Sequence, residues 1–231
     1  MLSNKDYWVL LISMSGTSGL RGTLLSLIQQ IMCTSGYSNT FVGLIGSMSA
    51  AAGFVGALGF AAFLDKTQLF KEVVKINNAI SVISASCFLT VVQMADEHVV
   101  LAILFFFYGL VSYSILSAGL ELAVECTFPV SPSLACGLIM FLVQIVVVVA
   151  LQLMDAIKQP SDNLLETCTF TGVTSDHSAV LPYNWFGPIV LWLSLATSFS
   201  LLVIVFFNGR YKRIEAEKLS SIDASMPSNA D

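Results

Sequence analysis

Long runs of hydrophobic residues, separated by short polar segments, fill almost the whole chain. A helix needs about 20 apolar residues to cross the hydrocarbon core of a bilayer. Six runs reach that length, at residues 7–32, 40–64, 73–94, 99–126, 133–157 and 183–207. The pattern predicts an all-α membrane protein with six transmembrane helices. The first run follows Lys5 and Asp6 as in a signal peptide, but it is longer than the apolar part of one, so we expect a retained span.

The composition agrees with a lipid environment: 56% of the 231 residues are hydrophobic and only 11% are charged. An average soluble domain has about 25% charged residues. The net charge is −5, and no run of basic residues indicates nucleic acid. The sequence has no phosphate-binding loop, metal-ligand spacing or nucleophile–base pair. We therefore expect a lipid bilayer as the surroundings, no nucleic-acid partner, no metal or other cofactor, and no enzymatic activity.

Lysine and arginine predict the orientation of the helices in the membrane. Eight of the ten basic residues lie before the first run, around the turn after the second, or after the last: Lys5, Lys66, Lys71, Lys75, Arg210, Lys212, Arg213 and Lys218. Only Lys158 falls in a loop on the other side. Because cytoplasmic loops are rich in lysine and arginine, both termini are predicted to be cytoplasmic. We expect a six-helix membrane domain over residues 1–213 and a disordered cytoplasmic tail over residues 214–231.

Small residues are concentrated in the first two runs. Their glycines are Gly16, Gly19, Gly22, Gly43, Gly46, Gly53, Gly56 and Gly59. Such helices pack closely against neighbours in a membrane, whereas the third and sixth runs are more uniformly apolar and are predicted to be peripheral. This order favours two three-helix repeats of inverted topology, as in one half of a major facilitator transporter.

Three residues within the runs, two of them strongly polar and one a tyrosine, are candidates for binding a solute. Arg21 lies near the middle of the first run, where a charge costs at least about 2.5 kcal/mol, so it should face protein or water. It either contacts a ligand, pairs with a carboxylate elsewhere, or belongs to a poorly packed fragment. Gln144 offers both a donor and an acceptor, for a ligand or for an interhelical hydrogen bond worth about 1 kcal/mol. Tyr113 is a further polar group on the fourth run.

Carboxylates near the predicted cytoplasmic ends are candidates for gating or proton coupling. Glu121 and Glu125 are four residues apart and so share a helix face. They either form gating salt bridges with another half of the protein, take up a proton, or are solvated or structurally paired. Asp65, in the turn after the second run, can accept hydrogen bonds at a helix end.

The five cysteines have two predicted environments. Cys87, Cys126 and Cys136 lie in or at the ends of apolar runs and are expected to pack as small hydrophobic residues. Cys33 and Cys168 lie on the same non-cytoplasmic side, so they either form a disulfide or remain free.

Two motifs resemble a known family. The stretch L-E-L-A-V-E-C-T-F-P-V-S, followed by C-G-L-I-M-F-L-V-Q, is similar to the join between the tenth and eleventh helices of the feline leukemia virus subgroup C receptor-related family, solute carrier family 49. The matching residues are Glu121, Val124, Glu125, Pro129, Gly137 and Gln144. The turn A-A-F-L-D-K-T-Q-L-F-K also resembles that family, and N-W-F at the start of the last run is most similar to its disrupted-in-renal-carcinoma member.

The resemblance implies that the chain is the C-terminal half, helices seven to twelve, of a twelve-helix major facilitator carrier. Members of the family carry heme, choline and ethanolamine, or pyridoxine. In the choline carriers the amide that matches Gln144 contacts the substrate, and an aromatic residue on helix seven lines the cavity. Here Gly22 takes that aromatic position with Arg21 beside it, which weakens a cage for a quaternary ammonium. The only histidines, His98 and His177, lie in outer loops, so the sequence itself gives no argument for heme.

The leading hypothesis is secondary transport of a small organic solute by alternating access. One six-helix half supplies only one wall of the solute cavity, so a missing N-terminal half or a second copy is expected as a partner. The alternative is a non-transporting half-length membrane protein: a receptor, a partner subunit or a truncated gene product. The resemblance implies a lysosomal or plasma-membrane location.

Overall fold

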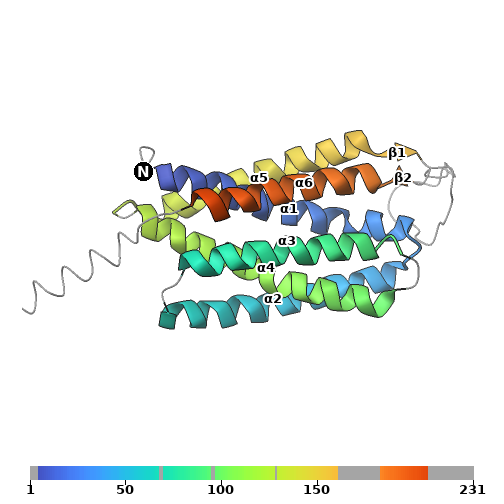
Figure 1. Cartoon of the computed structure of the whole chain (residues 1–231), viewed down its shortest axis with the longest axis horizontal. Helices are drawn as coiled ribbons and strands as arrows, with labels where there is room; N and C mark the ends of the chain where they lie inside the picture. The colour runs from blue at the N-terminus through green and yellow to red at the C-terminus, as the bar shows by residue number, and fades with distance from the viewer. Residues whose placement is uncertain (1–4, 68–69, 95–96, 128, 161–182, 208–231) are drawn as a thin grey trace, which may run out of the picture.

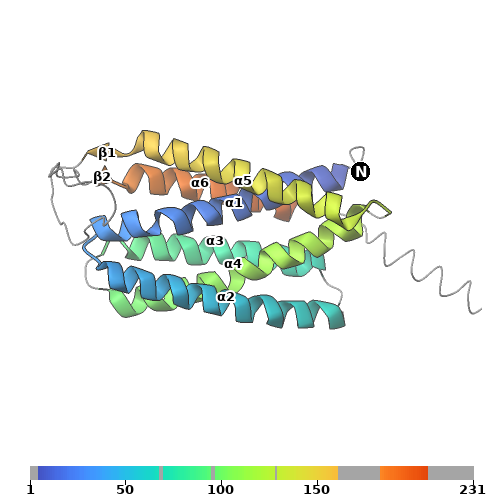
Figure 2. The same ribbon diagram turned by 180° about the vertical axis from the view of Figure 1, so that it is seen from behind.

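The computed structural model describes residues 5–67, 70–94, 97–127, 129–160 and 183–207. Six helices and two very short strands form this part of the chain: α1 Lys5–Thr34, α2 Asn39–Thr67, α3 Phe70–Val91, α4 His98–Thr127, α5 Pro132–Ile157, β1 Gln159–Pro160, β2 Tyr183–Asn184 and α6 Phe186–Phe206. The helices run side by side along one direction (Figures 1 and 2). The predicted all-α membrane fold is therefore confirmed.

Each predicted run corresponds to one helix, with both ends within three residues of the prediction. The sixth helix starts later than predicted because Tyr183 and Asn184 pair with Pro160 and Gln159 as a short antiparallel ladder. Five helices, α2 to α6, are long and apolar enough to cross a membrane. The remaining helix, α1, has 30 residues but is the least apolar of the six. It carries Arg21 and many serines and glycines, which pack inside the bundle instead of facing lipid.

The pairing of helices is symmetric between the two halves of the chain. Helix α1 packs mainly against α5 and α6, and α4 packs mainly against α2 and α3. The two remaining central contacts join α1 with α4 and α3 with α6. If α1, α2 and α3 are equated with α4, α5 and α6, the contacts of α1 and α4 correspond between the two repeats, whereas the contact of α5 with α6 has no counterpart of similar extent between α2 and α3. Two three-helix repeats that exchange partners in this way are the arrangement expected for half of a major facilitator fold.

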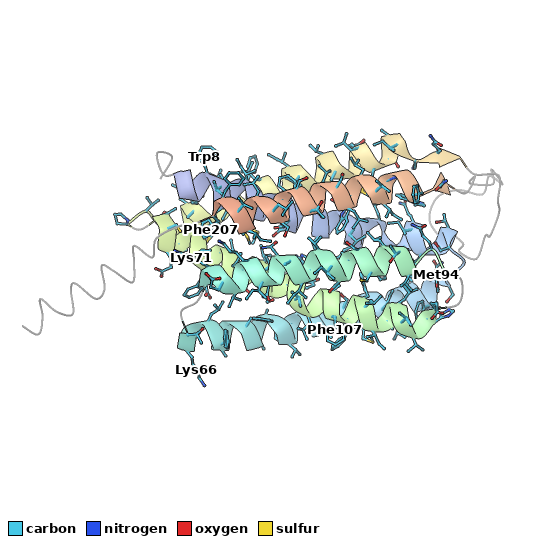
Figure 3. The ribbon with its side chains drawn as sticks, in the orientation of Figure 1. Trp8, Lys66, Lys71, Met94, Phe107 and Phe207 are labelled. Atoms are coloured by element: carbon cyan, nitrogen blue, oxygen red, sulfur yellow. The ribbon has the colours of Figure 1, made fainter. Side chains whose placement is uncertain are left out.

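The described basic residues of the predicted cytoplasmic side gather at one end of the bundle. Figure 3 places Lys66 and Lys71 at the same end as Trp8 and Phe207, with Met94 at the opposite end. Lys158 ends α5 at that opposite end, where it forms an ion pair with Asp155. The predicted tail and Arg210 lie outside the described residues. Which side of the membrane each end faces stays a prediction.

Glycine allows α2 and α4 to approach very closely. A Cβ atom at Gly56 would lie 2.1 Å from the carbonyl oxygen of Leu110, and one at Gly109 would lie 2.3 Å from the carbonyl oxygen of Ser49. By contrast, a Cβ atom at Gly46 or Gly59 would have nothing within 4 Å. Only part of the predicted small-residue face therefore lies in a helix interface within the described structure.

The cysteines divide only partly as predicted. Cys87, Cys126 and Cys136 are not disulfide-bonded, but of these three only Cys126 is buried, and Cys87 is exposed. Cys33, at the end of α1, is disulfide-bonded. Its predicted partner, Cys168, lies outside the described residues, so the identity of the pair stays a prediction.

Candidate functional site

A polar layer interrupts the hydrophobic core near the middle of the bundle. One apolar cluster fills the end that contains Tyr37, Phe105 and Trp185, and a second fills the end that contains Tyr7 and Phe207. Between them lies a cavity of about 30 Å³. Helices α1, α3, α4 and α6 line it with Thr17, Ser18, Leu20, Arg21, Asn78, Ser81, Val82, Tyr108, Ser112, Ile115, Trp192 and Ala196.

Arg21 is the charged group of this cavity. With a helical rise of 1.5 Å per residue, it lies roughly 24 Å along α1 from Lys5, near the middle of the helix. Its Nε and Nη1 atoms are buried and have no hydrogen-bond partner in the described part of the chain. The guanidinium carbon lies 4.1 Å from the centroid of the Tyr113 ring, which is a cation–π contact. The structure thus brings together two of the three predicted solute-binding residues.

Tyr113 is positioned by a glycine on the neighbouring helix. A Cβ atom at Gly53 of α2 would lie 2.3 Å from Cδ2 of Tyr113. Because Gly53 has no side chain, the ring can rest against the backbone of α2 while it contacts Arg21 of α1. The position of the aromatic face that receives the guanidinium therefore depends on a close approach of α2 and α4.

Three polar groups around Arg21, those of Thr17, Asn78 and Ser112, donate hydrogens to carbonyls of their own helices. The hydroxyl of Thr17 donates to the carbonyl of Ser13 at 3.0 Å, and the amide of Asn78 donates to the carbonyl of Val74 at 2.9 Å. Trp192 makes a bond between helices, since its Nε1 donates to the carbonyl of Leu20 at 2.8 Å. That bond ties α6 to α1 immediately beside Arg21.

Gln144 lies elsewhere. It is exposed on α5, while its neighbour Val143 is buried, and its amide makes no hydrogen bond within the described structure. Cβ atoms at Gly19 and Gly22 of α1 would lie 2.6 and 3.0 Å from Val146 and Val147, so these two valines of α5 face α1. The interhelical hydrogen bond considered from the sequence is thus not formed among the described residues, and the amide lies on the outer surface of the six-helix unit.

The predicted gating carboxylates differ in burial. Glu121 is exposed, whereas only 7% of Glu125 is exposed, although both lie on the last turns of α4. Both glutamates lie on one helix, four residues apart, as predicted. Only Glu125 is buried in the packed end of the bundle. The side chain of Asp65 lies outside the described residues. Their roles in gating or proton coupling stay predictions.

A second hollow, of about 400 Å³, lies between α2 and the start of α4. His98 is the first residue of α4, so it is not in a loop as the sequence indicated. Its ring contacts those of Tyr37 and Phe41 at centroid distances of 5.0 and 4.7 Å. The other residues that line the hollow are apolar: Met48, Val99, Ala102, Ile103, Phe106 and Phe107. Within the described residues no group of three potential metal ligands is present here or elsewhere.

Several cavity residues escaped the sequence analysis. The third and sixth runs were predicted to be peripheral, yet they contribute Asn78, Ser81 and Trp192 to the cavity. The signal was available for α3, because two adjacent asparagines in an apolar run require polar surroundings, and Asn77 and Asn78 are both buried. For Trp192 the sequence carried no comparable signal.

Comparison with known proteins supports the motif-based resemblance. No protein-family model matches the chain. The chain is 31% identical to solute carrier family 49 member A3 of Danio rerio over 223 residues, which cover 96% of this chain and 45% of that protein. It is 30% identical to solute carrier family 49 member A3 of Xenopus tropicalis over 217 residues, 94% of this chain and 44% of that protein.

An uncharacterised protein of Caenorhabditis elegans is 33% identical over 219 residues, which cover 94% of this chain and 43% of that protein. The similarities to the two member A3 proteins confirm the resemblance to solute carrier family 49. The chain spans a little under half the length of the curated relatives it matches. The relatives named as member A3 do not test the likeness to the disrupted-in-renal-carcinoma member, which stays a prediction.

Proposed function

We propose that this solute carrier family 49-like chain forms one half of a twelve-helix secondary carrier, which moves a small organic solute across a membrane by alternating access. The observation that carries the proposal is the exchange of partners between α1–α3 and α4–α6. In carriers built from such repeats, the solute binds near the middle of the membrane at the repeat interface. The relatives named as solute carriers support a transport role in general.

The exposed amide of Gln144 is the proposed contact between this half and the solute. An uncharged donor and acceptor on an apolar helix would be costly against lipid, because hydrocarbon offers no hydrogen-bond partner. Facing a solute cavity between two halves, the same side chain would hold a polar group without a change of protonation. The second half would come from an N-terminal segment of a longer protein or from a second copy of this chain.

The contact between Arg21 and Tyr113 bears on the choice among solutes. A carrier for choline needs a free aromatic face for the quaternary ammonium. The Tyr113 face already receives the guanidinium of Arg21 at 4.1 Å, and Arg21 would repel a second cation. A pyridoxine-like solute, which has hydroxyl groups and a small aromatic ring, therefore suits this half better than a choline- or ethanolamine-like one. For a heme-like solute the described residues offer one histidine, His98, which lies in an apolar hollow away from Arg21 and Gln144.

The proposed gate lies at the end of the bundle that holds Lys66 and Lys71 (Figure 3). Glu121 is exposed there, on the surface that another half would meet, whereas the buried Glu125 is placed to support the end of α4. Asp65 would act at the same end. We propose that this end faces the cytoplasm. The family resemblance favours the lysosomal or the plasma membrane as the location of the carrier.

Uptake of radiolabelled pyridoxine, choline, ethanolamine and heme by cells that express the chain, alone or within the longest transcript that contains it, tests the proposal. We expect uptake of pyridoxine above that of choline. Uptake by the longer product alone would identify the N-terminal half as the partner, and uptake by the chain alone would identify a second copy. Choline uptake above pyridoxine uptake would contradict the argument from Arg21.

A further inference from the structure

We propose that the cavity between α1, α3, α4 and α6 binds a small anion through the guanidinium of Arg21. The anionic group would be a halide ion or the carboxylate of a small solute, since both present a compact negative charge. The site lies within one six-helix half, so its failure would leave the transport proposal standing. The proposal rests on the charge, the donors and the size of the cavity.

The charge of Arg21 has no counterpart in the described protein. Arginine keeps its proton in proteins, so a guanidinium in the middle of the bundle is a full positive charge. Its Nε and Nη1 are buried and unpartnered within the described residues. No carboxylate is among the described residues that line the cavity, and the described ion pair of Lys158 with Asp155 lies at the end of α5. The contact with Tyr113 compensates only part of the lost hydration.

Neutral donors complete the site. The hydroxyls of Ser18 and Ser81 line the cavity and make no hydrogen bond in the described structure, so each has a hydrogen to donate. The amide of Asn78 uses one hydrogen for the carbonyl of Val74 and has a second. These groups come from α1 and α3 and line the same cavity as Arg21, whose Nε and Nη1 have no hydrogen-bond partner in the described structure. Donors gathered around one cation stabilise an anion and offer nothing to a second cation.

The size of the cavity limits the ligand. A cavity needs about 10–15 Å³ to hold one water molecule, so about 30 Å³ admits one or two waters, a halide ion or a carboxylate group. A whole organic solute is too large. Water alone would solvate Arg21 without neutralising it, whereas an anion does both in surroundings that are otherwise apolar at either end.

The first experiment measures the thermal stability of the purified chain in detergent, with gluconate as the starting anion. Chloride and, separately, formate replace gluconate at constant ionic strength in the millimolar range. We expect a saturable rise in Tm of roughly 5–11 °C when the anion is present at 100 times its apparent Kd. Saturation with chloride alone identifies an inorganic halide site, and saturation with formate identifies a carboxylate site. No saturable rise with either anion would overturn the proposal in favour of a water-filled cavity.

A pair of variants locates the response. Arg21→Gln removes the charge in the cavity and should abolish the saturable shift. Lys158→Gln removes a positive charge at the end of α5 and should leave the shift unchanged. An equal loss in both variants, or an unchanged shift in Arg21→Gln, would show that the anion binds elsewhere.

A fluorescence measurement covers the case in which Arg21→Gln does not fold. Trp192 lines the cavity, and replacing the other two tryptophans, Trp8→Phe and Trp185→Phe, leaves it as the sole reporter. Bromide bound beside Arg21 should quench Trp192 with a saturable dependence, and chloride should compete with it. Quenching that stays linear in bromide and insensitive to chloride would contradict an anion site at this cavity.

Discussion

The close approach of α2 and α4 makes a quantitative prediction for two glycines on the same helix. In the Gly56→Ala variant the new methyl group would lie 2.1 Å from the carbonyl oxygen of Leu110, and Cβ atoms do not approach other atoms closer than 3.0 Å. The clashing atom belongs to the backbone, so no side chain can rotate away. The helices must separate locally by about 1 Å, which also disturbs the contacts at Gly53 and Gly109.

Overpacking of this kind costs about 1–3 kcal/mol, and the gain in helix propensity from glycine to alanine, about 1 kcal/mol, offsets part of it. In Gly59→Ala the methyl group has nothing within 4 Å, so only the propensity gain remains. We expect Gly56→Ala to be about 2 kcal/mol less stable than Gly59→Ala. For a protein of this size that difference corresponds to roughly 4–8 °C in Tm.

The assay is thermal unfolding of the purified 231-residue chain in one detergent, followed by tryptophan fluorescence. Gly46→Ala serves as a second control, because its Cβ atom would also have nothing within 4 Å. The reasoning is refuted if Gly56→Ala unfolds at the same temperature as Gly59→Ala and Gly46→Ala. That result would mean that α2 and α4 are not in backbone contact at Gly56.

Three further predictions concern other parts of the chain. Gln144→Leu should abolish solute uptake with normal abundance in the membrane, while Gln152→Leu, roughly 12 Å further along α5, should retain it; equal uptake by both variants would remove Gln144 from the site. Tyr113→Leu loses the cation–π contact with Arg21 and should be about 0.5–2 kcal/mol less stable than Tyr113→Phe, which a lower Tm would report; equal Tm values would show that the contact contributes nothing. Maleimide should label three of the five cysteines in the denatured, unreduced protein and all five after reduction; labelling of Cys33 before reduction would exclude its disulfide.

The helices were predictable because each apolar run is long and the polar segments between them are short. In lipid every backbone group must be satisfied within its own segment, so a run of about 20 apolar residues leaves helix as the only solution. The ends of the helices were less well determined. Tyr183 and Asn184 form a short ladder with Gln159 and Pro160, a contact between distant segments that hydropathy does not register.

The candidate site was only partly predictable. Arg21 stood out because a charge inside an apolar run is expensive, and the sequence left open whether it meets a ligand or a carboxylate. That it stacks on Tyr113 depends on the approach of α2 at Gly53, which is a tertiary property. Asn78 and Ser81 were missed because the mostly apolar sequence of α3 assigned this helix to the periphery. The packing shows that α3 and α6 contact each other through the centre of the unit, so they too reach the cavity.

The separation of Gln144 from Arg21 also lay beyond sequence reasoning. Both are polar residues in apolar runs, and from the sequence they formed one solute-binding set. The structure places Arg21 inside the six-helix unit and Gln144 on its surface. We therefore propose different ligands for the two residues: a small anion for Arg21 within the six-helix half, and the transported solute for Gln144 between the two halves.

The central claim is that the protein containing this chain carries a small organic solute. The most direct test reconstitutes the purified protein into liposomes, incubates them in a cell extract of small molecules, and compares the contents with those of empty liposomes by untargeted mass spectrometry. The account predicts at least one organic solute that accumulates with the wild-type protein and fails to accumulate with Gln144→Leu. Identical contents in the wild-type, variant and empty liposomes would contradict it.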